Sequence, residues 1–186
     1  DLGERAWPMF RYHPDPETRT HLIHGLADYS IDPEILLSRL EQETDPGTVS
    51  AILIALGEFD LAYIPLSRRA SLRPALEDYY SEATDAGVRS AVEWLLKRWG
   101  MADKLAELDR PLLGQPLDGG RNWYLTKGGD FTMVLLPTPM AGFKVGSPLT
   151  EKNRSENEGQ VPVGSDRRVA IATKEVTVAQ FVRFAK

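Results

Sequence analysis

The chain has 186 residues, of which 42% are hydrophobic and 26% charged, and it contains no cysteine. This is the composition of an ordinary globular protein, and it excludes disulfides, thiolate metal sites and cysteine nucleophiles. No run approaches the ~18 apolar residues of a membrane span, and the first ten residues lack the features of a signal peptide. We therefore expect a cytoplasmic protein without membrane contact.

The net charge of −5 is unevenly distributed. Residues 1–110 hold 20 acidic and 12 basic side chains, whereas residues 111–186 hold 7 acidic and 10 basic ones. Phosphate contact requires clustered Lys and Arg. The first half is acidic and the bases of the second half are scattered, so we predict no nucleic-acid binding.

A motif recurs at residues 15–19, 45–49 and 85–89, each time just before an apolar helical pattern. Its Asp residues are 30 and 40 positions apart, a spacing found in helical-hairpin repeats. An Asp suits the N-cap of a helix, where its carboxylate accepts hydrogen bonds from free backbone N–H groups. The pattern predicts three repeated helices, each with one buried face.

Partner helices are expected between these motifs. Asp32 and Pro33 open one of them, and Pro74 favours a helix start near Arg73, because proline suits the first turn. Residues 4–12 are interpreted as the second helix of a repeat. The set resembles HEAT-like repeats, which implies an α-helical solenoid of about three hairpins over residues 1–109. We expect the larger aromatic side chains to pack inside or between repeats rather than to line a ligand groove: Phe59, Tyr79, Trp94 and Trp99.

The pattern changes after Asp109. Residues 110–121 are rich in Pro and Gly and predict a linker. Residues 147–166 are polar and predict a long exposed loop, the preferred place for proteolysis. The remaining stretches predict short strands joined by turns, with strands at 122–126, 131–136, 142–146 and 168–173 and turns at 128–130 and 137–139.

The final segment has the signature of a helix start. Thr177 and Gln180 form a capping box, and Val176 and Phe181 have the spacing of a hydrophobic staple. The predicted helix begins at Val178, eight residues before the last one. A helix this short has little stability of its own, so we expect it to dock on another surface and the domain to be incomplete.

Residues 131–184 resemble the start of a formylglycine-generating enzyme (sulfatase-modifying factor) domain. The matching pieces, in order, are Met133-Val134, Pro137, residues 143–148, 156–158 and 174–181. Val145 departs from the family's usual Met, and residues 162–164 depart from its Pro-His pair. The resemblance implies that residues 122–186 are the N-terminal portion of a C-type-lectin-like fold, and that the whole chain is α+β. The copper and calcium sites that the family implies would lie in other residues, so we expect no catalytic, cofactor-binding or metal residue here.

The combination of helical repeats with such a domain resembles large bacterial kinase-associated signalling proteins. The favoured hypothesis is a non-catalytic interaction scaffold, a fragment whose partner is another protein or the remainder of its own domain. One alternative is part of a copper-dependent formylglycine-generating oxidase. Others are a lectin-like binding module and a protease substrate or cleavage product.

Several residues are of types that could carry chemistry. His21 and His24 have metal-ligand spacing on a predicted helix, but His13 is the only further histidine and a zinc site needs more ligands. Surface carboxylates on helices are mostly solvated, and no serine follows a nucleophile motif. Glu77, Asp78 and residues 82–85 are interpreted as surface acids. Gly128 and Gly129 are interpreted as a turn, and residues 153–155 as a formal glycosylation sequon.

Overall fold

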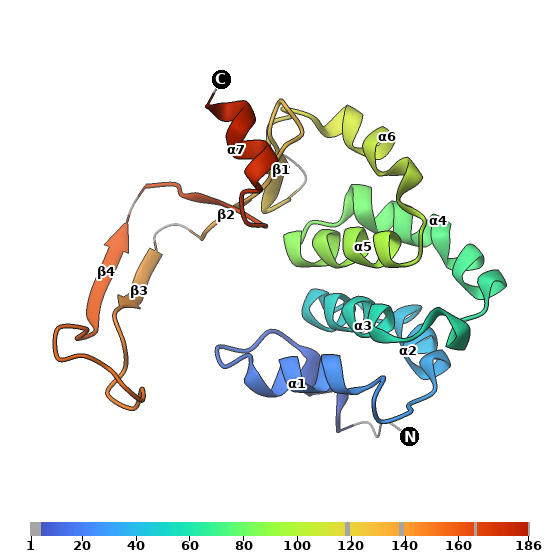
Figure 1. The fold of residues 1–186 in the computed structure, drawn as a ribbon, viewed down its shortest axis with the longest axis horizontal. Helices are drawn as coiled ribbons and strands as arrows, with labels where there is room; N and C mark the ends of the chain where they lie inside the picture. The colour runs from blue at the N-terminus through green and yellow to red at the C-terminus, as the bar shows by residue number, and fades with distance from the viewer. Residues whose placement is uncertain (1–4, 118–119, 138–139, 166, 186) are drawn as a thin grey trace.

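The structure, a computed structural model, describes residues 5–117, 120–137, 140–165 and 167–185. The fold is α+β, with helices first and two small antiparallel sheets after them (Figure 1). The helices are α1 (Glu17–Gly25), α2 (Pro33–Leu40), α3 (Pro46–Glu58), α4 (Leu66–Glu82), α5 (Ala86–Arg98), α6 (Leu105–Asp109) and α7 (Val178–Phe184). The strands are β1 (Trp123–Leu125), β2 (Thr132–Leu135), β3 (Met140–Val145), β4 (Val161–Ser165) and β5 (Ala170–Ala172).

Helices α1, α3 and α5 are stacked one above another in Figure 1. Helix α2 packs on α3, and α4 packs on α5. The central helix α3 has neighbours on several sides, so its Ile52, Leu53 and Leu56 are fully buried. Each such side chain contributes about 1.5–3 kcal/mol on burial. Packing of this kind, rather than helix propensity, holds the helical part together.

Two of the three repeated Asp residues have the predicted capping role. Asp45 and Asp85 accept hydrogen bonds from the backbone N–H groups three residues further on, at 2.9 and 3.0 Å. Asp32 caps α2 through the N–H of Glu34, which is two residues further on, at 2.9 Å. Asp15 differs, because its carboxylate accepts from the N–H of Glu17 while Pro16 occupies the N-cap position of α1.

The expectations for Pro74 and for residues 4–12 were wrong. Helix α4 begins at Leu66, so Pro74 lies in its interior. Leu72 and Leu76 are buried on either side of Pro74, and this packing offsets the backbone hydrogen bond that proline cannot donate. In the N-terminal segment only Trp7–Phe10 form a short 3₁₀ turn, and Glu4 lies outside the described residues.

An extended segment around Tyr12 crosses the N-termini of α3 and α5. The Tyr12 hydroxyl donates to the Asp85 carboxylate at 2.8 Å and accepts from Ser50 at 3.4 Å. A Cβ at Gly47 would meet the Tyr12 backbone nitrogen, and a Cβ at Gly87 would meet its hydroxyl. Both glycines occupy the same place in the repeated motif, so the two helix ends together form a cradle for one tyrosine.

The three-stranded sheet has the order β1-β2-β5, and all of its pairs are antiparallel. The predicted hairpin between β1 and β2 is confirmed. The N–H of Thr126 donates to Phe131, and Gly129 adopts a φ of 70° that favours glycine. Within the expected linker, Leu113 forms a bridge to Leu125. Residues 118–119 of that segment, and residues 138–139 of the predicted turn, lie outside the described residues.

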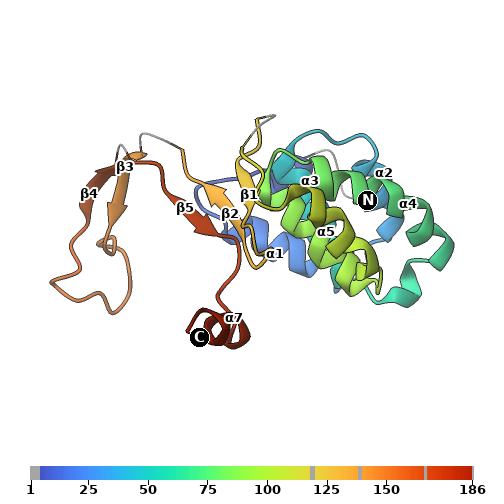
Figure 2. The ribbon, with the colours of Figure 1, turned by 90° about the horizontal axis from the view of Figure 1, so that it is seen from above.

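Strands β3 and β4 form a separate two-stranded hairpin that projects away from the helices (Figures 1 and 2). Strand β4 lies inside the stretch predicted as a loop. It was not predicted because it contains Pro162 and Gly164, and both residue types are depleted from strands. The connection is also ordered: Arg154 donates to the Ser147 carbonyl at 2.9 Å, and the Ser147 N–H donates to the Glu158 carbonyl. The description of 147–166 as only a loop was therefore wrong.

Candidate functional site

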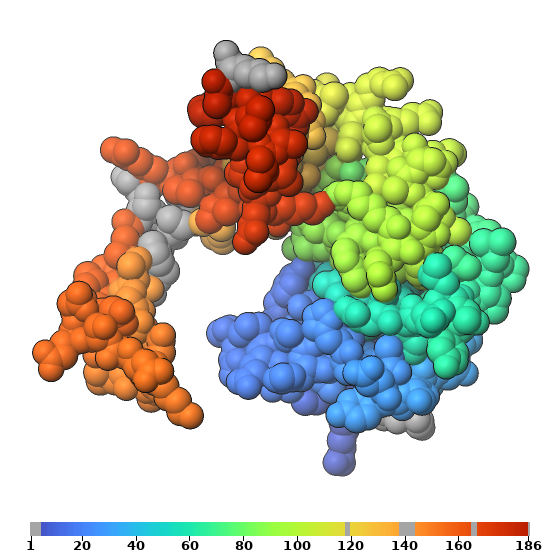
Figure 3. Space-filling view, viewed as in Figure 1, coloured from blue at the N-terminus to red at the C-terminus, as the bar shows by residue number. Residues whose placement is uncertain are grey.

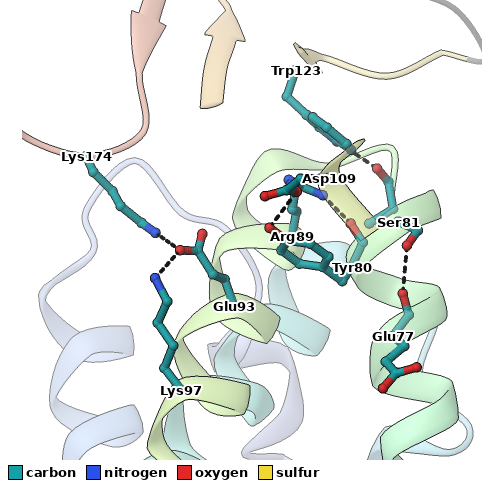
Figure 4. A network of polar contacts seen from close by, with 10 residues as sticks. Glu77, Tyr80, Ser81, Arg89, Glu93, Lys97, Asp109, Trp123 and Lys174 are labelled. Carbon is teal, nitrogen blue, oxygen red and sulfur yellow. Dashed lines mark hydrogen bonds and ion pairs between the residues drawn. The ribbon is translucent and has the colours of Figure 1, made fainter. Parts of the chain in front are cut away.

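The helices and the three-stranded sheet meet at Arg89, a residue of α5 with only 1% of its surface exposed. Its guanidinium forms an ion pair with Asp109 and donates to the Tyr80 carbonyl at 2.6 Å (Figure 4). The guanidinium carbon also lies 3.8 Å from the centre of the Tyr80 ring and 4.3 Å from that of Trp123. The cation is thus enclosed between two aromatic faces while it pairs with a carboxylate.

Strand β1 is attached to the turn between α4 and α5. The Trp123 indole N–H donates to the Ala83 carbonyl at 2.7 Å. Asn122 is bound twice, since its N–H donates to Thr84 and its side-chain oxygen accepts from the N–H of Ala86. These contacts fix the sheet against the helical part through backbone groups, so the two parts form a defined joint.

The Tyr80 hydroxyl completes this network by donating to the Asp109 carboxylate at 2.8 Å. Burial strongly raises the pKa of Tyr80, so the phenol remains a protonated donor. A buried ion pair is costly to break, because the remaining charge is left without a partner. The network therefore holds elements together, and it contains no nucleophile activated by a base.

A second contact joins α5 to the segment before α7. Glu93 accepts hydrogen bonds from Lys97 and from Lys174, each at 2.5 Å (Figure 4). Burial alone would raise the pKa of Glu93, but the bonds from Lys174 and Lys97 outweigh it and lower that pKa below its ordinary value. Glu93 therefore remains charged at neutral pH and holds Lys174 against α5.

A small pocket of about 180 Å³ lies beside these two contacts. Tyr80, Glu93 and Asp109 line it from the helical side, and Asp130 and Lys174 from the sheet side. Three of its charged groups, Glu93, Asp109 and Lys174, are engaged in the ion pairs described above. Within the part of the chain that the structure describes, no group of three or more His, Asp or Glu side chains is arranged to hold a metal ion.

The three histidines are not brought together. His24 lies 2.7 Å from a Glu58 carboxylate oxygen, and His21, largely exposed, lies 3.8 Å from Glu17. The His13 ring contacts only the backbone of Asp15 among the contacts described. The histidines thus form separate surface contacts with acidic residues and share no common centre.

The acidic candidates are also separate. Glu77 accepts from Arg73 at 2.6 Å, Asp85 caps α5, and Asp78 and Glu82 are exposed. The packing prediction for the aromatic residues is confirmed. Phe59 and Trp99 are buried, and Tyr79 and Trp94 are partly buried against the same core.

Helix α7 presents the most unusual surface of the described chain. Its polar side faces inward: the Gln180 amide donates to the Asp130 carbonyl at 2.7 Å, and Arg183 pairs with the Asp130 carboxylate at 2.5 Å. Its apolar side chains face outward, with exposed fractions of 81% for Val178 and 87% for Phe184. We call the exposed group Val176, Val178, Phe181, Val182 and Phe184 the α7 patch.

The sequence identified the start of this helix but not its orientation. Thr177 accepts from the Gln180 N–H at 3.2 Å, and Gln180 accepts from the Thr177 N–H at 2.8 Å, which confirms the capping box. The shortness of the predicted helix implied only that it docks on another surface. In the structure the helix docks through Gln180 and Arg183, and Figure 3 shows its residues, in dark red, at the surface of the molecule.

Comparisons with protein-family models, with curated proteins and with solved structures found no match. No helix among the described residues is long and apolar enough to cross a membrane.

Proposed function

We propose that this chain is a non-catalytic protein-interaction scaffold, and that the α7 patch is its binding surface. The observation that carries the proposal is the inverted orientation of α7, with Gln180 and Arg183 held by Asp130 and Phe184 exposed. Contiguous exposed apolar surface of several hundred Å² is typical of interaction sites. The proposed partner is a protein that supplies a complementary apolar surface.

The helical part serves in this proposal as a rigid support of the HEAT-like kind. The equivalent caps of α3 and α5, the contacts of α1 and α5 with α3, and the cradle around Tyr12 support this interpretation. Stacked helical pairs bury a continuous core and expose long surfaces that suit binding. The Arg89 network then fixes the sheet, and with it α7, relative to the support.

We further propose that residues 122–186 adopt a segment related to formylglycine-generating enzyme domains, without chemistry of their own. The strand pair with its turn at Gly129 and the capping box at Thr177 support the resemblance. Within this proposal the segment needs neither copper nor calcium in these residues. Its role is to carry the α7 patch.

The proposal is tested by selecting binders from a displayed library of apolar peptides against the immobilised chain. Binders selected on the native protein should lose affinity for Phe181→Glu, because burying an unpaired carboxylate opposes apolar contact. Leu149→Glu is the matched control, since Leu149 is 89% exposed and lies in the β3–β4 connection. If no selected peptide distinguishes Phe181→Glu from Leu149→Glu, the α7 patch is not the binding surface.

A further inference from the structure

We propose that a groove between the N-terminal 3₁₀ turn and helix α1 binds an acidic peptide segment of a partner protein, with a carboxylate of that segment paired to Arg11 and Arg19. The site is separate from the α7 patch, since α1 and α7 lie far apart in Figure 1. The inference goes beyond the proposed function and does not depend on the α7 patch. It follows from the shape of the groove, its free basic groups and its apolar part.

The groove is formed by a short stretch of chain. All of its lining residues lie between Pro8 and Arg19, and its volume is about 520 Å³. Ligand sites have volumes of roughly 300–1,000 Å³. Every lining residue except Arg19 is exposed, so the groove is open to solvent. An open groove of this size suits an extended peptide segment better than an enclosed small molecule.

Arg19 is a half-buried cation without a carboxylate partner. Its Nε donates to the Phe10 carbonyl at 2.8 Å, and its Nη2 donates to the Gly47 carbonyl and to the Ser50 hydroxyl, each at 2.9 Å. All of these acceptors are neutral, and Nη1 has no acceptor among the described residues. Burial lowers the pKa of Arg19 below its ordinary value, because the charge has lost water and gained no anion. A ligand carboxylate supplies that anion.

Arg11 adds a second free positive charge to the groove. Its side chain is exposed, and no carboxylate of the described residues pairs with it. The one acidic residue among the groove's lining residues is Asp15, whose carboxylate accepts from the Glu17 N–H at 3.0 Å. Two arginines therefore face one aspartate that is already bound. The groove is locally positive, although residues 1–110 carry a net negative charge.

The remaining part of the groove is apolar. Pro8 and Met9 line it beside the arginines, and Met9 is 46% exposed. An acidic residue next to an apolar one matches these two features, because methionine adapts its shape to an apolar partner. The net charge of the helical part opposes an acidic peptide only at long range. At physiological salt, charges more than about 8 Å apart are largely screened.

Counter-selection of a displayed heptapeptide library tests the site. Peptides selected on the native chain are depleted on Arg11→Glu, and Arg19 is left unchanged because it also holds the N-terminal segment to α3. The surviving peptides should contain Asp or Glu, and their dissociation constants should rise at least about five-fold for Arg11→Glu. Arg11→Gln, which adds no new charge, should weaken binding by a smaller factor of about two to three.

Arg110→Glu is the matched control. It makes the same charge change at an exposed position that follows α6, and it should change the dissociation constants by less than about two-fold. The proposal is overturned if no peptide survives the depletion step. It is also overturned if the surviving peptides lack acidic residues, or if Arg110→Glu weakens binding as much as Arg11→Glu.

Amide chemical shifts then locate the bound peptide. Titration of the isotope-labelled native chain with a surviving peptide should shift the amides of residues 8–19, and raising the salt concentration should weaken binding. Shifts confined to residues 176–184 overturn this inference and leave the α7 patch as the binding surface. If the shifts fall at residues 8–19 while no peptide distinguishes Phe181→Glu from Leu149→Glu, this inference stands and the proposed function of the α7 patch fails.

Discussion

The guanidinium carbon of Arg89 lies 4.3 Å from the centre of the Trp123 indole, and this stacking joins α5 to β1. Because Arg89 is buried and paired with Asp109, its replacement has consequences for both parts of the fold. Arg89→Met should reduce the free energy of unfolding by about 3–5 kcal/mol, since it leaves the Asp109 charge without its partner. Urea denaturation measures the loss.

The matched control is the double variant Arg89→Met/Asp109→Leu, which removes both charges. It should recover most of the stability lost by Arg89→Met, because an apolar pair can replace a buried ion pair at little cost. If the double variant is as unstable as the sum of the two single variants, the interaction between Arg89 and Asp109 is not the source of the effect.

Gly57 should not tolerate a larger residue. A Cβ at this position of α3 would overlap the ring of Trp94 on α5. Gly57→Ala should therefore destabilise the chain by about 1–3 kcal/mol through overpacking, although alanine favours helices. Gly25→Ala is the control, because the nearest atom there belongs to the exposed ring of Tyr29, which can move. Thermal unfolding that ranks Gly25→Ala below Gly57→Ala would contradict this packing.

Pro74→Ala should stabilise the chain. Proline inside α4 lacks the N–H that would bond the preceding turn, and an interior proline costs a helix ~3 kcal/mol. Part of the gain is offset because alanine makes the unfolded chain more flexible, so we expect about 1–2 kcal/mol. A rise in the urea midpoint at an unchanged slope is the expected signature, and a fall would show that the proline ring contributes packing of its own.

The Glu93 contact should make stability depend on acid pH. Its folded-state pKa is lowered, so its contribution is present above the ordinary value of 4.5 and is lost as pH falls through the folded value. Glu93→Gln should be less stable than the native chain at neutral pH, and the difference should shrink as pH falls below the ordinary value of 4.5. Urea unfolding at several pH values, with the exposed Glu82 replaced in the same way as the control, checks this dependence.

The sequence predicted most of what depends on neighbouring residues. The caps at Asp32, Asp45 and Asp85, the turn at Gly129 and the capping box at Thr177 were all found where expected. Each of these features is a hydrogen bond or backbone conformation within a few residues of the chain. Such local preferences can be predicted without knowledge of the fold.

The features that sequence reasoning missed depend on contacts between distant segments. Pro74 is tolerated inside α4 because Leu72 and Leu76 pack on the core, and strand β4 forms because it pairs with β3. The burial of Arg89 depends on Trp123 and on Asp109, both far along the chain. The shortness of the helix that begins at Val178 implied that it docks, but the sequence could not show that it docks through Gln180 and Arg183.

The cradle around Tyr12 has a consequence for how this architecture can change in evolution. The Tyr12 hydroxyl contacts the N-terminal ends of two helices, α3 and α5. At Gly47 and Gly87 of these ends there is no room for a Cβ beside Tyr12. Tyr12 therefore fixes the position of the N-terminus of α5 relative to that of α3. An insertion that lengthens the loop before Asp85 leaves these contacts of Tyr12 possible. A single residue added inside α3 or α5, in contrast, would move a helix end away from the Tyr12 hydroxyl.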